Sequence, residues 1–326
     1  MKAITISRPG GPEVLQITEL PDPVPAAGEV LIRVRASGIN HADAYMRSGA
    51  WGQVAAVPGI EAVGTVEADP AGRLAPGTAV MAILGGMGRT RNGSYAEMIT
   101  IPATNVVPIT TELPWTTLAA IPEVYATAWS ALTDNLRIRA GQTVLVRGAT
   151  SALGQSVVDL AADLEAIVVA TTRSPEQAAK LKELGADTVL IDDGALAGQV
   201  HDRGLRIDAV ADLVGNSVLR DSLACCAPRG RVCQLGFLGG LAPVADFNPL
   251  ADLPTGIQLS FFGSAFVLGT PDYPLSAVPL QEIVDKAATG RLRLRPPRLF
   301  AFEEVVEAHR AMEAGTAGGK MVIGIA

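Results

Sequence analysis

Residues 142–175 carry the side chains whose types and spacing fit a known kind of chemistry, the binding of a dinucleotide. Apolar runs at 143–146 and 166–170 predict two buried strands, with a turn of small residues at 148–152 and a helical pattern between them. In such a unit a pyrophosphate can reach the helix N-terminus, where unpaired backbone N–H groups favour anions. The residues expected to meet the cofactor at this turn are Thr150, Ser151, Ala152 and Leu153.

The end of the second strand selects the cofactor. Units that prefer NAD carry Asp or Glu there, because a carboxylate accepts hydrogen bonds from the ribose hydroxyls. This chain has Thr172 and Arg173 and no acid at that place. Because a guanidinium fits a 2′-phosphate, the sequence predicts NADPH as the cofactor, held by these two residues.

Two features leave a plainer interpretation open. The full fingerprint of a dinucleotide turn is G-x-G-x-x-G, and only its last glycine, Gly154, is present here. Ala149 and Ser151 occupy the other two glycine places. A lone arginine at a strand end, such as Arg173, is often a solvated surface charge, so the prediction depends on the strand, turn and helix that precede it.

Composition bounds the class of protein. At 326 residues the chain can form two domains, and its net charge of −7 argues against sequence-independent nucleic-acid binding. No apolar run is long enough for a membrane span, and the first ten residues lack the apolar region of a signal peptide. The three cysteines, Cys225, Cys226 and Cys233, offer neither a disulfide framework nor a zinc spacing. We therefore expect a cytoplasmic protein that binds neither nucleic acid nor membranes.

The pattern of elements changes along the chain. Residues 1–117 contain short strands broken by Gly and Pro, which predicts a partly closed antiparallel β domain. Residues 118–264 alternate strands with helices, which predicts an α/β domain with a doubly wound parallel sheet. Its expected strands are 143–147, 166–171, 187–191, 208–214, 231–236 and 257–262. Residues 265–326 lack this alternation and are expected to return and complete the first domain.

With these residues in view, the chain resembles the medium-chain dehydrogenase/reductase superfamily, and within it the zinc-free quinone oxidoreductases related to zeta-crystallin. The resemblance extends over essentially the whole length. It rests on the dinucleotide turn and on the segments 38–43, 58–61, 93–97, 127–128, 208–215 and 318–320. It implies a GroES-like β domain completed by the C-terminus, a Rossmann domain that binds NADPH, and an active site in the cleft. It also implies a homodimer that forms through the strand at 257–263.

Asn40 marks a departure from the wider superfamily, because zinc-dependent alcohol dehydrogenases carry a ligand cysteine at that place. A catalytic zinc needs about three protein ligands, and His41, Asp43 and Glu61 are the only plausible set nearby. We expect no metal. Without a Lewis acid an alcohol is a poor hydride donor, whereas a quinone or an α,β-unsaturated carbonyl accepts hydride and spreads the charge. The expected partner is therefore a small quinone or enone.

The resemblance also implies the roles of individual residues. Asn40 and Tyr45 are expected to be catalytic, although a turn-forming asparagine and a pocket wall are alternatives for them. The remaining cofactor-binding residues that it implies are Thr127, Gly215, Asn216, Leu235, Gly236, Phe237, Phe262, Gly263 and Lys320. Helix packing for Thr127, a strand-end turn for the glycines and a surface charge for Lys320 remain open as alternatives.

Three functions are compatible with the sequence. The first is a zinc-independent, NADPH-dependent reductase of quinones or enones. The second keeps the hydride chemistry but reduces an enoyl thioester. The third is an NADPH-binding protein with a structural or regulatory role and little turnover.

Overall fold

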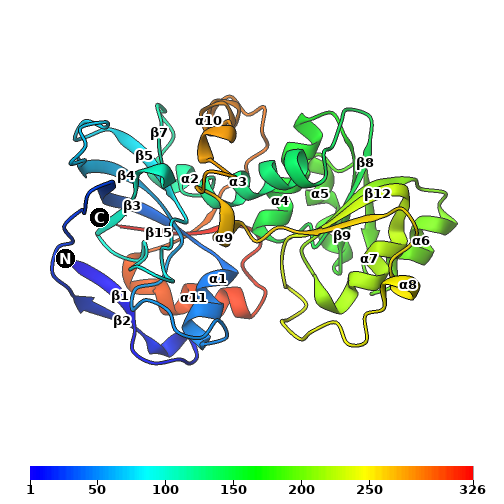
Figure 1. Ribbon diagram of the computed structural model, residues 1–326, viewed down its shortest axis with the longest axis horizontal. Coiled ribbons are helices and arrows are strands. Elements are labelled where there is room, and N and C mark those ends of the chain that lie inside the picture. The colour runs from blue at the N-terminus through cyan, green and yellow to red at the C-terminus, as the bar shows by residue number, and fades with distance from the viewer. Residues whose placement is uncertain (326) are drawn as a thin grey trace. The chain divides into compact units, whose positions relative to one another are not determined.

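The computed structural model describes residues 1–325, which form two compact units (Figure 1). One unit consists of Met1–Ala126, Ala265–Ala288 and the chain from Arg295 onward. The other consists of Thr127–Ser264 and Thr289–Leu294.

The second unit is built on a six-stranded sheet with the order β10-β9-β8-β11-β12-β13. All of its strand pairs are parallel, so their carboxyl ends share one edge of the sheet. The strands are β8 (Thr143–Arg147), β9 (Ile167–Thr172), β10 (Thr188–Ile191), β11 (Ile207–Asp212), β12 (Cys226–Gln234) and β13 (Gln258–Phe261). The strand order reverses between β8 and β11, which is the point where open α/β sheets bind their ligands.

Helices connect these strands, as the alternating sequence pattern predicts. They are α4 (Ala152–Asp163), α5 (Ala178–Leu184), α6 (Leu196–Asp202) and α7 (Leu219–Cys225). Short 3-10 turns, Pro175–Gln177 and Asn216–Val218, precede α5 and α7. The central strands are buried on both faces, with Val144, Leu145 and Val146 fully inaccessible, because helical crossovers cover a parallel sheet on both sides.

The first unit contains a seven-stranded sheet with the order β14-β15-β3-β4-β5-β7, in which β6 also pairs with β3. These strands are β3 (Glu29–Ile39), β4 (Glu61–Ala68), β5 (Ala79–Ile83), β6 (Met98–Pro102), β7 (Val106–Pro108), β14 (Arg298–Phe300) and β15 (Met321–Gly324). The C-terminal β15 runs antiparallel to β3, with Met321 opposite Ile39, so the last part of the chain returns to the sheet that residues 29–108 begin (Figure 1). Together with the parallel sheet of the other unit, this confirms the predicted fold class.

One predicted strand is shorter than expected. The pattern predicts a strand from Ser94 to Ile101, but β6 begins only at Met98. The preceding residues pair with β1 (Lys2–Ile6) instead, since Ile4 N donates to Tyr95 O at 2.8 Å. β1 also forms a hairpin with β2 (Leu15–Glu19), so both of its edges are used.

Further helices complete both units. Helix α8 (Pro249–Asp252) lies in the second unit. The others are α1 (His41–Ser48), α2 (Trp115–Leu118), α3 (Pro122–Ser130), α9 (Ser264–Val267), α10 (Leu280–Ala288) and α11 (Val305–Glu313). A π-helical turn, Ala131–Asn135, continues α3. Within residues 1–325, no helix combines the length and apolarity that a membrane crossing requires.

Strand β13 is an edge of the six-stranded sheet and exposes two large apolar side chains. Leu259 is 37% and Phe261 is 55% exposed, and an open apolar edge favours pairing with another chain. We expect a homodimer formed through β13, and we expect Phe261→Lys to give a monomer because the lysines would meet across the paired edges. Light scattering after size-exclusion chromatography measures the mass.

Leu250→Lys is the matched control, because Leu250 is 93% exposed in α8 and is not part of this edge strand. That variant should keep the mass of the unaltered protein. A monomeric unaltered protein at micromolar concentration would contradict the dimer.

Candidate cofactor pocket and active site

The turn after β8 is stabilised by Ser151 at the N-terminus of α4. Its hydroxyl oxygen accepts a hydrogen bond from Gly154 N at 3.1 Å and donates one to Gly148 O at 2.9 Å. Gly148 has a φ of 83°, which favours glycine. A Cβ on Gly154 would lie 2.4 Å from Gly148 O, so the one glycine retained from the fingerprint is the one that lets α4 approach the strand. The first N–H groups of α4 have no intrahelical acceptor.

A pocket of about 330 Å³ lies at the carboxyl ends of the strands in this unit. Three predicted cofactor residues, Thr150, Thr172 and Arg173, line it. The other lining residues are Gly148, Thr171, Asp192, Asp193, Gly194, Val214, Val218, Leu238 and Gly239. The Thr172 hydroxyl accepts a hydrogen bond from Ser174 N at 3.0 Å and so holds the turn that carries Arg173.

Asp192 and Asp193 are pocket residues that the sequence analysis missed. They directly follow β10, which lies next to β9 in the sheet. The signal was present, because the strand predicted at 187–191 ends at these two acids. The prediction considered only the acid position at the end of the second strand, whereas the neighbouring strand also reaches the pocket.

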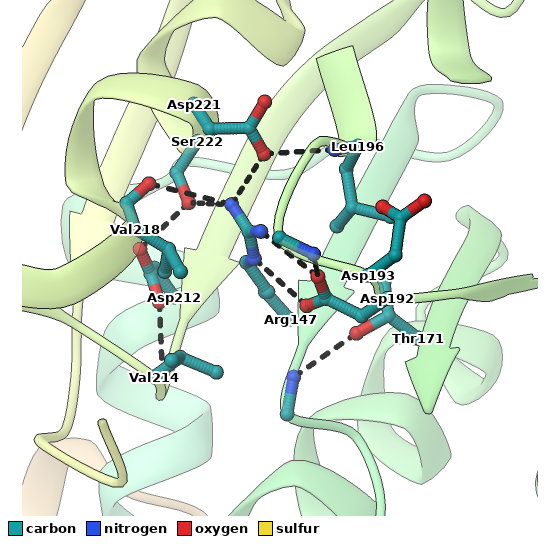
Figure 2. Close-up of polar contacts among 12 residues, drawn as sticks. Arg147, Thr171, Asp192, Asp193, Leu196, Asp212, Val214, Val218, Asp221 and Ser222 are labelled. Carbon is teal, nitrogen blue, oxygen red and sulfur yellow. Dashed lines mark hydrogen bonds and ion pairs between the residues drawn. The ribbon is translucent and has the colours of Figure 1, made fainter. Parts of the chain in front are cut away.

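Beneath the pocket lies Arg147, the last residue of β8, with a fully buried side chain (Figure 2). Its guanidinium forms ion pairs with Asp192 at 2.9 Å and with Asp221 at 2.8 Å. It also donates to the Ser222 hydroxyl at 3.0 Å, and this hydroxyl donates to Asp212 at 2.7 Å. Burial lowers the pKa of Arg147, but hydrogen bonding and the charges of its partners outweigh this and raise it.

The predicted residues after β11 and β12 are brought together at the same edge. Asp212 accepts from Val214 N at 2.9 Å and from Gly215 N at 2.8 Å, and burial raises the pKa of its carboxyl group. Gly215 has a φ of 84°, and a Cβ there would lie 2.4 Å from Gly236 O. Asn216 Oδ1 accepts from Gln234 Nε2 at 2.9 Å.

The other predicted cofactor residues of this unit are not among the residues that line the pocket. Leu235 directly follows β12 and is buried, and its N–H donates to Asp212 O at 2.7 Å. Phe237 contacts the ring of Phe261 with centroids 5.8 Å apart. Phe262 is buried directly after β13 and precedes Gly263, while Thr127 is buried in α3.

In the first unit, Asn40, Glu61 and Lys320 form a closed hydrogen-bonded cluster. Asn40 Nδ2 donates to Glu61 Oε1 at 2.7 Å, and Lys320 Nζ donates to Asn40 Oδ1 at 2.7 Å. Lys320 also forms an ion pair with Glu61, and both side chains are at most 5% exposed. Glu123 N donates to the second Glu61 oxygen at 2.7 Å. Lys320 is therefore a buried charge, and the Asn40 amide has a fixed orientation.

Asp43, in the first turn of α1, begins a second buried chain of hydrogen bonds. Its carboxylate accepts from Asn40 N at 2.8 Å, Gly59 N at 3.0 Å and the Tyr95 hydroxyl at 3.2 Å. The Tyr95 hydroxyl also lies 3.2 Å from His309 Nε2. Burial raises the pKa of Asp43 to about 7 and lowers that of His309 to about 3. Asp43 thus holds the Asn40 loop in place.

Tyr45 is half-buried in α1, with its ring 5.8 Å from that of Trp51. Burial raises the pKa of its hydroxyl, so the side chain stays protonated at neutral pH. Within residues 1–325, no three His, Cys, Asp or Glu side chains form a group that could hold a metal ion.

Comparisons with known proteins agree with this architecture. Residues 26–111 match the alcohol dehydrogenase GroES-like domain, and residues 184–323 match the family described as zinc-binding dehydrogenase. The chain is 30% identical to the quinone oxidoreductase of Mus musculus, over 99% of this chain and 97% of that protein. The chain belongs to the quinone oxidoreductase family of the medium-chain dehydrogenase/reductase superfamily, as its sequence resemblance predicted.

Other relatives and solved structures support the same placement. The quinone oxidoreductase of Pseudomonas aeruginosa is 28% identical over 99% of both chains. A mycobacterial protein solved in complex with NADPH superposes with a TM-score of 0.87 at 27% identity, covering 100% of both chains. A phenolphthiocerol/phthiocerol polyketide synthase of Mycobacterium tuberculosis is 28% identical over 99% of this chain, but the match covers only 15% of that protein.

The buried His309 predicts a specific pH dependence of stability. Because its pKa in the folded chain is far below the ordinary value of 6.5, the unfolded chain binds the proton first as the pH falls. We expect the unfolding free energy of the unaltered protein, relative to His309→Gln, to fall by about 2–3 kcal/mol between about pH 6.5 and 4.5. Urea denaturation across this range measures it.

The raised pKa of Asp43 gives the opposite slope, with stability lost as the pH rises from 3.8 towards about 7. This contribution is common to the unaltered protein and the His309 variant, so their difference isolates the histidine. His201→Gln is the control, since His201 is exposed in α6. Parallel pH profiles for the unaltered protein and His309→Gln would refute the assignment.

Proposed function

We propose that this protein is an NADPH-dependent reductase that transfers hydride to a quinone or an α,β-unsaturated carbonyl. The main support is the position of Arg173, which lines the pocket at the carboxyl ends of the strands, because no acid stands at the end of β9. The family membership and the NADPH complex of the mycobacterial relative support it. When bound, NADPH supplies the hydride.

The residues at the turn fit such a cofactor. The N-terminus of α4, at Ala152 and Leu153, offers N–H groups and a positive dipole end to a pyrophosphate. Arg173 offers a planar set of donors to a 2′-phosphate. Ser151 acts indirectly, because its hydroxyl is already committed to the turn backbone.

On the acceptor side we assign the Asn40 amide as a hydrogen-bond donor. One of its two N–H groups is directed to Glu61, and its oxygen accepts from the Lys320 ammonium. These two contacts fix the orientation of the amide, so its second N–H is positioned in advance as a donor to a carbonyl that gains negative charge. Tyr45, whose hydroxyl pKa is raised further by burial, is the second proposed donor.

The enoyl-thioester alternative has its own support. The mycobacterial polyketide synthase aligns over nearly the whole chain at 28% identity, so a related domain lies inside a larger protein. An NADPH-binding role with little turnover is the third possibility. We further propose a cytoplasmic homodimer whose substrate is a small molecule.

Steady-state assays of NADPH consumption with a panel of quinones, enones and enoyl thioesters test the function. We expect turnover with quinones or enones, a preference for NADPH over NADH, and activity that survives treatment with a chelator. Turnover with enoyl thioesters alone would select the second function. Tight NADPH binding without turnover on any acceptor would contradict a reductase, and loss of activity on chelation would contradict the zinc-independent assignment.

Arg173→Ala tests the cofactor assignment. Removing the guanidinium should narrow the binding preference for NADPH over NADH by ~1–3 kcal/mol, the contribution of a charged hydrogen bond. Dissociation constants for both cofactors, from fluorescence titration, measure this. Arg203→Ala is the control, because Arg203 is exposed after α6 and does not line the pocket. Equal preference before and after Arg173→Ala would defeat the assignment.

A further inference from the structure

The pocket that contains Arg173 also contains two carboxylates. Asp192 and Asp193 enter it from the turn after β10. Like charges repel strongly where the dielectric is low, so two free carboxylates would oppose the phosphate that Arg173 is proposed to bind. Asp at a strand end can also accept hydrogen bonds from a free ribose diol, which favours a cofactor without the 2′-phosphate.

Asp192 differs from an ordinary pocket acid because a buried cation, Arg147, donates to both of its oxygens. Arg147 Nε donates to Oδ2 at 2.9 Å and Arg147 Nη2 donates to Oδ1 at 2.9 Å, the two-pronged geometry of a strong guanidinium–carboxylate pair (Figure 2). Gly194 N donates to Oδ1 at 3.0 Å as well. The Arg147 side chain is inaccessible, and only 10% of the Asp192 side chain is exposed.

Asp193 lacks such a cation. Its Oδ1 accepts from Ala195 N at 3.0 Å and from Gln199 Nε2 at 3.3 Å, which are neutral donors. One acid in the pocket is therefore paired with a buried charge, and the other is held by uncharged groups.

A second contact fixes the turn that carries both acids. Arg147 Nη1 pairs with Asp221 at 2.8 Å, and Asp221 in turn accepts from Leu196 N at 2.9 Å and Ala197 N at 3.1 Å. These two N–H groups belong to the first turn of α6. Arg147 thereby holds the end of β10 and the start of α6 at once, so the turn between them has little freedom to redirect Asp192.

We infer that Arg147 determines cofactor specificity as a positioning residue: its charge, shared between Asp192 and Asp221, offsets part of the charge of Asp192, and its two-pronged contact holds both Asp192 oxygens away from the ribose. The pocket then accepts a nucleotide with a phosphate on its ribose rather than one with a free diol. This inference rests on the proposed use of NADPH. Arg147 acts through Asp192, from beneath the pocket, and is absent from the residues that line it.

A series of charge variants tests it, with the ratio of NADH to NADPH dissociation constants as the readout. Arg147→Met leaves Asp192 charged and should lower the preference for NADPH roughly tenfold. Asp192→Asn removes one negative charge from the pocket while Arg147 stays paired with Asp221, and should raise the preference for NADPH. The double variant removes the pair together and should return the ratio to within about threefold of the unaltered protein.

Two controls separate charge from shape and location. Arg147→Lys keeps the charge without the fork, so its ratio should lie closer to that of the unaltered protein than the ratio of Arg147→Met. Asp202→Asn removes an exposed carboxylate of α6 that does not line the pocket, and should leave the ratio unchanged. Circular dichroism establishes that each variant is folded.

Equal weakening of both cofactors by Arg147→Met, without recovery of the ratio in the double variant, would overturn the inference and leave the proposed function intact. If Arg147→Met does not fold, Asp192→Asn decides: an unchanged or lower NADPH preference overturns the inference. Failure of the unaltered protein to bind either nucleotide would overturn the proposed function and this inference with it.

Discussion

The arrangement of the cofactor pocket depends on one buried guanidinium. Arg147 ends the central strand β8, where a charged side chain is costly unless it is fully paired. Its contacts reach the end of β10 through Asp192, the start of α6 through Asp221 and the end of β11 through Ser222 and Asp212. The turn between β10 and α6, the helix α7 and the end of β11 therefore take their positions around a single cation at the ligand-binding edge of the sheet.

The first unit uses the same principle with a different cation. Lys320 is buried beside Glu61, and the pair fixes the amide of Asn40 between them. Buried ion pairs contribute little net stability, because desolvation of both groups offsets their attraction. Their effect here is geometric. The Arg147 pairs hold Asp192 in one orientation, and the Lys320–Glu61 pair holds the Asn40 amide in one orientation, as a proposed donor to a substrate requires.

Local sequence patterns predicted the elements well and their polar contacts poorly. The apolar runs of the second unit predicted all six parallel strands because buried strands read as continuous hydrophobic segments. Gly154 and Arg173 were found from their spacing within one strand–turn–helix–strand unit. The partners of Arg147 and Lys320 could not be found in this way, since Lys320 meets Glu61 across 259 positions of sequence. Only the closed sheets bring such residues together, so their burial follows from tertiary structure.

In the proposed cofactor complex, Arg173 faces the 2′-phosphate while Arg147 keeps Asp192 away from it. This arrangement can be tested by a crystal structure of the protein grown with NADPH. We expect the Arg173 guanidinium to contact the 2′-phosphate and both Asp192 oxygens to remain on Arg147. A structure in which Asp192 turns to the ribose, or in which the phosphate lies away from Arg173, would contradict it.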